Sequence, residues 1–232
     1  MSDFPVISLQ NAGVAYSYRS GFMKKSSYWA LKDINCDLHH GETLGVIGRN
    51  GAGKTSLLRL MTGIINPSRG KVTRQTNRVA MLSLQVGFLP NLTGRDNAIL
   101  SALLLGLSKK EATEKMDKII DFSELEEFID QPLRSYSTGM RARLGFAVAM
   151  QADPDVLLID EILGVGDRDF KLKSSQALKE RIKSDKTVVL VSHQPETIRS
   201  LCDRALWIEN RESRLLGPVD EVLAAYRTSG RQ

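Results

Sequence analysis

The chain contains 232 residues, of which 42% are hydrophobic and 25% are charged, and its formal net charge at pH 7 is +5. This composition is that of a soluble globular protein and excludes collagen-like, low-complexity and disordered chains. The excess of basic residues is compatible with a polyanion, a nucleotide or an anionic membrane surface as partner, without discriminating among them.

No segment has the pattern of a membrane-spanning helix or a secretory signal. The longest apolar stretch, between Ile99 and Leu107, is shorter than the roughly 18 to 20 residues needed to cross a bilayer. The N-terminus has neither the basic region nor the apolar core of a signal peptide. Cys36 and Cys202 lack the spacing of metal or redox sites, so we expect both to be reduced packing residues. These features predict a cytoplasmic protein.

The first part of the chain is predicted to be mainly extended. Apolar and aromatic residues recur over two segments on either side of a Gly-, Ser- and Lys-rich loop at 17–27, which indicates a hairpin. A short apolar strand then leads into a glycine-rich turn and a helix, and two more strands follow. The expected strands are 6–16, 29–38, 43–47, 71–73 and 78–82, and the expected helix is 54–61.

The remainder of the chain is predicted to be a helical insertion followed by alternating strands and helices. Expected helices are 95–107, 109–120, short helices up to 128, then 138–151, 169–183, 195–202 and a closing helix that starts at Pro218. Expected strands are 156–159, 187–191 and 205–208. Because continuous apolar strands alternate with helices, the fold class is α/β with a mainly parallel core sheet.

Residues 48–55 read GRNGAGKT, a complete GxxxxGK[ST] pattern between the expected strand and helix. Glycines allow backbone N–H groups to face phosphate oxygens, Lys54 reaches the terminal phosphates, and the Thr55 hydroxyl ligates Mg²⁺. A glycine-rich turn with a solvated lysine is the alternative. The predicted nucleotide-binding residues here are Gly48, Asn50, Gly51, Ala52, Gly53, Lys54, Thr55 and Ser56.

Two carboxylates follow the apolar strand at 156–159. The carboxyl ends of strands in α/β sheets form the ligand crevice, so Asp160 and Glu161 are expected there. Asp160 is predicted to hold Mg²⁺, and Glu161 to act as the general base that polarises the water attacking the terminal phosphate. A helix-capping acid pair is the alternative.

The segment YSTGM at 136–140 begins a helix, where a hydroxyl, a glycine and free N–H groups suit an anion. By itself it is a capped helix start. Placed before Asp160, however, it resembles the signature segment of the nucleotide-binding subunits of ATP-binding-cassette (ABC) transporters. The resemblance extends from about Leu9 to Tyr226. It implies one nucleotide-binding domain over 1–232, with the ABC-ATPase fold, an N-terminal antiparallel β-subdomain and a helical subdomain at about 94–152.

The resemblance also assigns roles to single residues. Tyr16 matches the aromatic residue that stacks on adenine, although Tyr18 competes for this role. Gln85 matches the glutamine that senses Mg²⁺ and the attacking water, with a spacing one residue shorter than usual. Asp167 matches a loop at the dimer interface, and His193 the histidine that contacts the terminal phosphate. Taken singly, these residues have ordinary alternatives as a strand aromatic, a helix cap and a loop histidine.

The family's active form implies that two copies face each other head to tail. Each ATP then lies between the phosphate-binding loop of one copy and the signature helix of the other, so one chain holds half of each site. Ser137, Thr138 and Gly139 are expected to contact the ATP bound by the partner copy. The implied ligands are ATP and Mg²⁺, and the implied partner is an integral membrane subunit, in two copies, docked on residues 95–128.

Departures from the general family pattern narrow the resemblance. The chain has YSTGM in the signature segment, Ile162 after the acid pair, LGVGD at 163–167 and GFLPNLTGRDN at 87–97. With the ending GPVDEVLAAY at 217–226, these segments look like ATPases that export O-antigen, capsule or teichoic acid. Members with a C-terminal carbohydrate-binding domain continue further, and the chain is expected to lack that domain.

The function implied is ATP hydrolysis that powers export of a lipid-linked polysaccharide, by a peripheral subunit on the cytoplasmic face of the membrane. An ABC subunit for another cargo, such as a lipid or a drug, is the first alternative. A soluble ABC-type ATPase acting on nucleic acid is disfavoured, because such proteins carry two cassettes or long coiled-coil insertions. The signature segment and His193 disfavour a P-loop kinase or GTPase. The basic loop at 17–27 either contacts lipid headgroups or the membrane subunit, or stays solvated.

Overall fold

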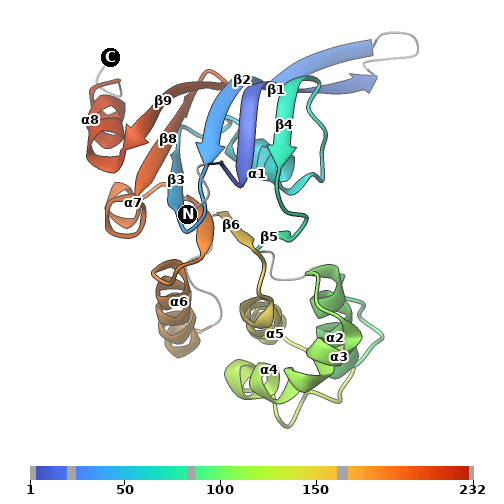
Figure 1. The fold of residues 1–232 in the computed structure, drawn as a ribbon. Helices are drawn as coiled ribbons and strands as arrows, with labels where there is room; N and C mark the ends of the chain where they lie inside the picture. The colour runs from blue at the N-terminus through green and yellow to red at the C-terminus, as the bar shows by residue number, and fades with distance from the viewer. Residues whose placement is uncertain (1–3, 20–24, 83–86, 161–166, 230–232) are drawn as a thin grey trace. The chain divides into compact units, whose positions relative to one another are not determined.

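The computed structural model describes residues 4–19, 25–82, 87–160 and 167–229. They divide into two compact units (Figure 1). The first contains Met1–Met81, Val156–Glu161 and Ile182–Gln232, and the second contains Leu82–Asp155 and Ile162–Arg181. Strands and sheet contacts belong to the first unit, whereas the second unit is helical.

The first unit is built on a nine-stranded sheet with the order β4-β1-β2-β9-β8-β3-β7-β6-β5. The strands are β1 (Ile7–Arg19), β2 (Lys25–Leu38), β3 (Thr43–Ile47), β4 (Arg69–Arg74), β5 (Val79–Met81), β6 (Val156–Asp160), β7 (Thr187–Val191), β8 (Arg204–Glu209) and β9 (Glu212–Pro218). Strands β8, β3, β7, β6 and β5 pair in parallel, while β4, β1 and β2 form an antiparallel part. The expected α/β class with a parallel core is thereby confirmed.

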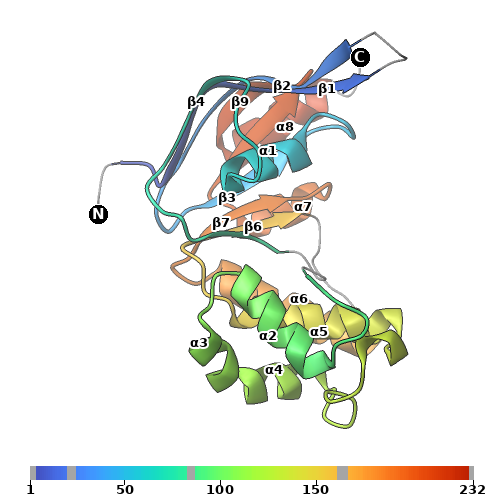
Figure 2. The same cartoon turned by 90° about the vertical axis from the view of Figure 1, so that its right-hand side faces the viewer.

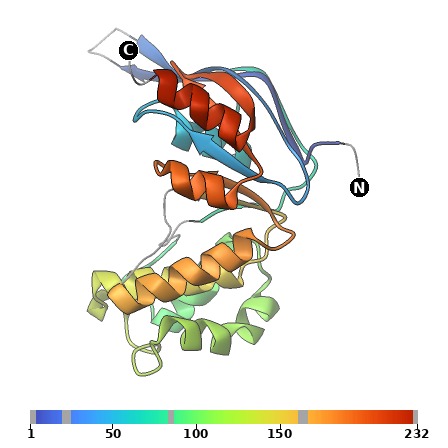
Figure 3. The same ribbon diagram turned by 90° about the vertical axis from the view of Figure 1, so that its left-hand side faces the viewer.

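Three helices cover the sheet. Helix α1 (Lys54–Thr62) buries Leu57, Leu58, Leu60 and Met61 and contacts β2 as well as β5 and β6, so it lies between the antiparallel strands and the parallel core (Figure 2). Helices α7 (Pro195–Leu201) and α8 (Val219–Ser229) pack against one another, and α8 contacts β8 and β9 (Figure 3). Strands β3 and β7 are buried throughout, because both of their faces are covered.

The second unit consists of helices packed through small side chains. Its helices are α2 (Gly94–Leu104), α3 (Lys109–Glu114), α4 (Met116–Ser123), α5 (Thr138–Gln151), α6 (Arg168–Ile182) and the 3₁₀ turn η1 (Leu133–Ser135). Ala98 and Ala102 of α2 share one core with Leu144, Ala147 and Val148 of α5. Helix α6 belongs to this unit in addition to the segment 94–152. Among the described residues, no helix has both the length and the apolar character needed to cross a membrane.

Several element boundaries differ from the sequence-based expectation. The loop expected at 17–27 is shorter, because β1 and β2 continue their antiparallel pairing through Ser17 and Ser27 to Arg19 and Lys25. Backbone pairing across the hairpin overrides the polar composition of these ends. Strand β9 was not expected, since its partly exposed residues carry no clear alternation; antiparallel pairing with β8 defines it.

The helical expectations need smaller corrections. Pro218 ends β9, and the closing helix starts one residue later at Val219. The helix expected at 109–120 is divided at Lys115 into α3 and α4. No helix forms over the described residues 124–128, because Glu124 adopts a left-handed conformation with φ 57° and ends α4.

Candidate functional site

The predicted phosphate-binding loop connects β3 to α1 and is held by close backbone packing. A Cβ atom at Gly53 would lie 2.5 Å from the Ala30 carbonyl oxygen of β2. A Cβ atom at Gly48 would lie 2.5 Å from the Ile208 carbonyl oxygen of β8. Gly51 and Gly53 also have φ angles of 78° and 109°, which residues with side chains rarely adopt. The glycines therefore allow the loop to lie directly against two strands.

Lys54 begins α1 and is 8% exposed. Its Nζ donates hydrogen bonds to the Gly48 carbonyl oxygen at 2.8 Å and to the Arg49 carbonyl oxygen at 3.2 Å. No side chain caps α1 at Gly53, and its first turn has no acidic residue. The ammonium group and the N-terminal N–H groups of α1 thus present positive charge at one place, which is the arrangement that binds phosphate.

Two residues expected to hold Mg²⁺ meet although they are far apart in sequence. Thr55 Oγ1 donates a hydrogen bond to Asp160 Oδ2 at 2.9 Å. Asp160 ends β6, whose preceding residues are buried, so the sheet places this carboxylate at the carboxyl end of its parallel strands. Hydroxyl and carboxylate oxygens are the ligands that Mg²⁺ prefers, and these two oxygens fit such an ion together with nucleotide phosphates and water.

A cavity of about 700 Å³ opens beside this loop, within the first unit. It is large enough for a nucleotide-sized ligand. It is lined by Tyr28, Ala30, Asn50, Gly51, Gly53, Lys54, Thr55, Ser56, Asp160, His193 and Arg211. The structure thus brings together most of the predicted loop residues, Asp160 from β6 and His193 from the end of β7. Tyr28, Ala30 and Arg211 were not singled out from the sequence.

The aromatic side chain that lines the cavity is Tyr28, which is 48% exposed. Tyr16 faces it across the hairpin, with ring centroids 5.6 Å apart and an interplanar angle of 35°. Tyr16 packs against the hydrophobic core, and its buried hydroxyl has no hydrogen-bond partner among the described residues. The Tyr18 side chain lies outside the described part of the structure. The strand register could have indicated Tyr28, because it pairs directly with Tyr16.

The segment at 136–140 forms a capped helix start in the second unit. Ser137 Oγ accepts a hydrogen bond from the Met140 N–H at 3.1 Å and caps α5. Thr138 and Gly139 begin the helix, whose first turn has no acidic residue. The Tyr136 hydroxyl donates to the Phe128 carbonyl oxygen at 2.7 Å, and burial raises the pKa of Tyr136 to about 12. This neutral anchor positions the start of α5.

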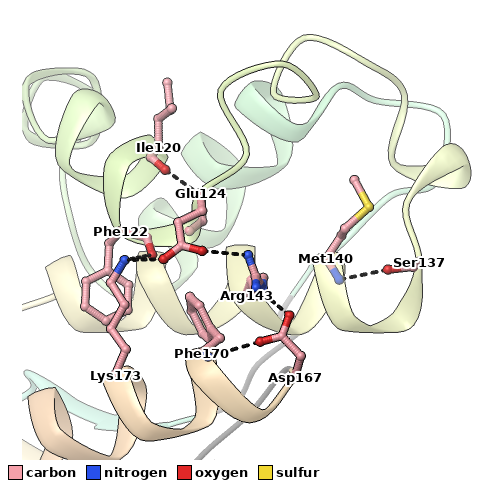
Figure 4. Close-up of polar contacts among 10 residues, drawn as sticks. Ile120, Phe122, Glu124, Ser137, Met140, Arg143, Asp167, Phe170 and Lys173 are labelled. Atoms are coloured by element: carbon pink, nitrogen blue, oxygen red, sulfur yellow. Dashed lines mark hydrogen bonds and ion pairs between the residues drawn. The ribbon is translucent and has the colours of Figure 1, made fainter.

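A network of ion pairs connects α5 to the start of α6 (Figure 4). Glu124 accepts from Arg143 at 3.0 Å and from Lys173 at 2.8 Å, and Arg143 also donates to Asp167 at 2.5 Å. The Lys173 hydrogen bond lowers the pKa of Glu124. Asp167 Oδ1 accepts from the Phe170 N–H at 3.0 Å, and this bond lowers its pKa. Asp167 therefore caps α6, while its role at a dimer interface stays a prediction.

The two cysteines are packing residues, as expected. Cys36 is buried and Cys202 is partly buried, and both are free. Burial raises the pKa of each thiol to about 12, so neither forms a reactive thiolate at neutral pH. Two further predicted site residues, Gln85 and Glu161, fall in segments 83–86 and 161–166, outside the described residues.

Comparisons with known proteins identify the family of the chain. The family model described as ABC transporter matches residues 31–164. The O-antigen export system ATP-binding protein RfbB of Klebsiella pneumoniae is 45% identical over 205 residues, which cover 88% of this chain and 83% of that protein. The teichoic acids export ATP-binding protein TagH of Listeria monocytogenes serotype 4b (strain F2365) is 41% identical over 209 residues, which cover 88% of this chain and 62% of that protein.

The fold also matches solved structures. A dimeric ATP-binding cassette in a post-hydrolysis state, bound to ADP and Pi, superposes with a TM-score of 0.72 and 24% sequence identity, covering 92% of this chain and 98% of that one. An ATP-binding subunit of an ABC transporter gives a TM-score of 0.73 at 21% identity, with coverages of 95% and 93%. The chain belongs to the ABC transporter family and has the fold of an ATP-binding cassette.

Proposed function

We propose that this chain hydrolyses ATP to drive export of a lipid-linked cell-surface polysaccharide across the cytoplasmic membrane. The observation that carries the ATPase part is the cavity lined by Lys54, Thr55, Asp160 and His193. The polysaccharide part is supported by the relatives named above, whose descriptions refer to O-antigen and teichoic acid export.

In this proposal the phosphate chain of ATP binds between Lys54 and the first turn of α1. The Lys54 ammonium now bonds two carbonyl oxygens of its own loop, so it is already desolvated and directed inward. Exchange of these neutral acceptors for phosphate oxygens pairs the ammonium with an acceptor of opposite charge. The loop is therefore organised before the nucleotide arrives, and little ordering is needed on binding.

Thr55 and Asp160, which both line the cavity, would hold Mg²⁺. When bound, the ion neutralises charge on the β- and γ-phosphate oxygens. The hydrogen bond between Thr55 and Asp160 keeps both oxygens at one point, so neither side chain has to be reoriented from another partner. Asn50 to Ser56 supply the remaining contacts to the phosphate chain.

Hydrolysis needs a base, and the proposed base is Glu161, the residue after Asp160. It would take a proton from the water that attacks the γ-phosphorus, while the bond from this phosphorus to the β,γ-bridging oxygen breaks and ADP leaves. Gln85 would orient this water, and His193 would contact the terminal phosphate. A positioned base of this kind contributes about 10² to 10⁴ in rate. His193 lies on the cavity wall at the end of β7, which supports its part of the assignment.

Completion of the site would require a second copy of the chain. Ser137, Thr138 and Gly139 of one copy are proposed to contact the γ-phosphate bound by the other, at the free N–H groups of α5. ATP would then stabilise the closed homodimer, and hydrolysis would remove that preference. Adenine would stack on Tyr16 or on its cavity-lining neighbour Tyr28.

The work of this cycle is proposed to reach a separate integral membrane subunit, present in two copies, with the ATPase bound at the cytoplasmic face and with no nucleic acid as partner. The docking region would be residues 95–128. Leu103 and Leu104 on α2 in this region are 40% and 57% exposed, which is consistent with a surface that another protein covers.

The test is affinity purification of the tagged protein from detergent-solubilised membranes of its own host, followed by mass spectrometry. We expect a multi-span membrane protein in near 1:1 ratio, and loss of surface polysaccharide when the chromosomal copy carries Glu161→Gln. Recovery from the soluble fraction alone, or with nucleic acid, would contradict the transporter assignment. A normal glycan surface together with a changed lipid or drug phenotype would indicate another cargo.

A further inference from the structure

The turn that joins β8 to β9 has an unusual residue for its backbone conformation. Asn210 and Arg211 form a two-residue hairpin turn with φ angles of 50° and 71°. Turns with positive φ at both central residues favour Asn followed by Gly, because a side chain at the second position meets the backbone. Asn210 fits this preference, whereas Arg211 occupies the glycine position. An arginine at a position whose backbone conformation favours glycine is unfavourable for folding, and this suggests that its side chain has a function.

The strands around it hold this turn in place. Glu209 of β8 pairs with Glu212 of β9, which closes the hairpin directly beneath Arg211. The Lys32 N–H of β2 donates a hydrogen bond to the Arg211 carbonyl oxygen at 2.7 Å. Three strands therefore fix the position of the Arg211 Cα, so the side chain extends from rigid backbone and not from a flexible loop.

Arg211 lines the wall of the nucleotide cavity together with Asn50, Gly51 and Lys54. It also lines a neighbouring cavity of about 660 Å³, which shares Asn50 and Gly51 as lining residues. Arg211 thus stands beside the tip of the phosphate-binding loop, on the boundary between the two cavities. The β8–β9 hairpin lies far from this loop in sequence, and only sheet pairing brings them together.

The nearby carboxylates engage other cations. Glu212 lies 3.8 Å from Lys32, and Glu209 lies 3.9 Å from Arg214. Within the described residues, the exposed Arg211 guanidinium makes no hydrogen bond and no ion pair. A guanidinium offers a planar set of donors that matches phosphate oxygens.

We propose that Arg211 is a nucleotide-binding residue of this chain, whose guanidinium contacts phosphate oxygens of the ATP held by Lys54 and α1. It adds a second cation on the outer side of the loop tip, where Asn50 and Gly51 leave the phosphate chain accessible. This inference rests on binding of ATP at the phosphate-binding loop, which the proposed function includes.

The test is isothermal titration of the purified full chain with the non-hydrolysable analogue AMP-PNP and Mg²⁺. Arg211→Gly should weaken the affinity about 3- to 10-fold, the range for losing one charge-assisted contact that is partly solvent-screened. Arg211→Lys should weaken it less, since the charge remains but the planar donor set is lost. Arg214→Ala, which removes an exposed arginine from the same hairpin, is the matched control and should bind like wild type.

The glycine variant also reports on its own folding. Because glycine suits φ 71°, Arg211→Gly should melt at the wild-type temperature or about 1 to 3 °C above it. Lys54→Ala in the same titration identifies the phosphate-binding loop as the site that is measured. If Lys54→Ala binds AMP-PNP like wild type, the proposal that nucleotide binds at this loop is wrong. If Lys54→Ala loses binding while Arg211→Gly does not, or if Arg214→Ala loses as much as Arg211→Gly, the inference about Arg211 is wrong.

Discussion

Replacement of Gly53 by alanine tests whether the phosphate-binding loop is held by backbone packing against β2. Gly53 is the N-cap of α1 and has a φ angle of 109°. A Cβ atom there would lie 2.5 Å from the Ala30 carbonyl oxygen and 2.6 Å from Leu31 Cδ2. Both distances are shorter than the contact distance of non-bonded atoms. The contact with the Ala30 carbonyl oxygen involves backbone, which cannot rotate away as a side chain can. Either the loop or β2 must therefore move.

The expected loss in the free energy of unfolding of Gly53→Ala has two parts. The unfavourable φ angle costs about 1 to 3 kcal/mol for a residue with a side chain. Insertion of a methyl group into a closely packed site costs about 1 to 3 kcal/mol more. Gly51→Ala is a matched control, because Gly51 has a φ angle of 78° but open space at the position that a Cβ atom would take. The control variant should carry the first cost without the second.

Chemical denaturation and nucleotide titration measure the two effects separately. Gly53→Ala should lower the free energy of unfolding by about 2 to 6 kcal/mol, against about 1 to 3 kcal/mol for Gly51→Ala. It should also weaken nucleotide binding by about tenfold or more, because displaced N–H groups no longer converge on the phosphates. Equal stability losses in the two variants would refute the packing argument, since strain alone would then account for both.

Three further predictions concern the base, the ion-pair network and the aromatic residues. Glu161→Gln should keep ATP binding, trap a dimer and nearly abolish turnover, and wild-type hydrolysis would contradict its role as base. Glu124→Gln should lower thermal stability at neutral pH, because the lowered pKa of Glu124 in the folded state contributes stability above its ordinary value of 4.5. That contribution is lost as the pH falls through the folded-state pKa, so the two melting curves should converge in acid; a constant difference would exclude the linkage. Tyr28→Ala should weaken the binding of ATP more than the binding of phosphate-only ligands such as pyrophosphate. Equal losses of affinity for both ligands would show that Tyr28 does not contact adenine.

The phosphate-binding loop was predictable because its determinants are local. Glycines that tolerate positive φ, a buried apolar strand before them and a helix after them all lie within residues 43–62. The meeting of Thr55 with Asp160 was also predictable, since the loop that leads to Thr55 begins at the carboxyl end of β3 and Asp160 ends the parallel strand β6. The cap at Ser137 follows from the type and position of one residue.

Other features depend on pairing between distant segments. Sequence patterns missed β9, because its residues have mixed exposure and only β8 supplies their backbone partners. Sequence patterns proposed Tyr16 or Tyr18 as the residue that stacks on adenine, and they did not single out Tyr28, which pairs with Tyr16 across the hairpin and lines the cavity. They identified Asp167 by its position in the chain, while tertiary packing pairs it with Arg143.

By itself, the sequence determined the fold class, the phosphate-binding loop, the carboxylate that ends β6 and the capped start of α5, because each is specified by residues close together in the chain. Tertiary structure alone decided that Tyr28 and Arg211 border the same cavity as Lys54. Residues 28, 54 and 211 are brought together by strand register and by the order of the strands in the sheet. These depend on the summed packing of the whole first unit, which no local pattern of residues contains.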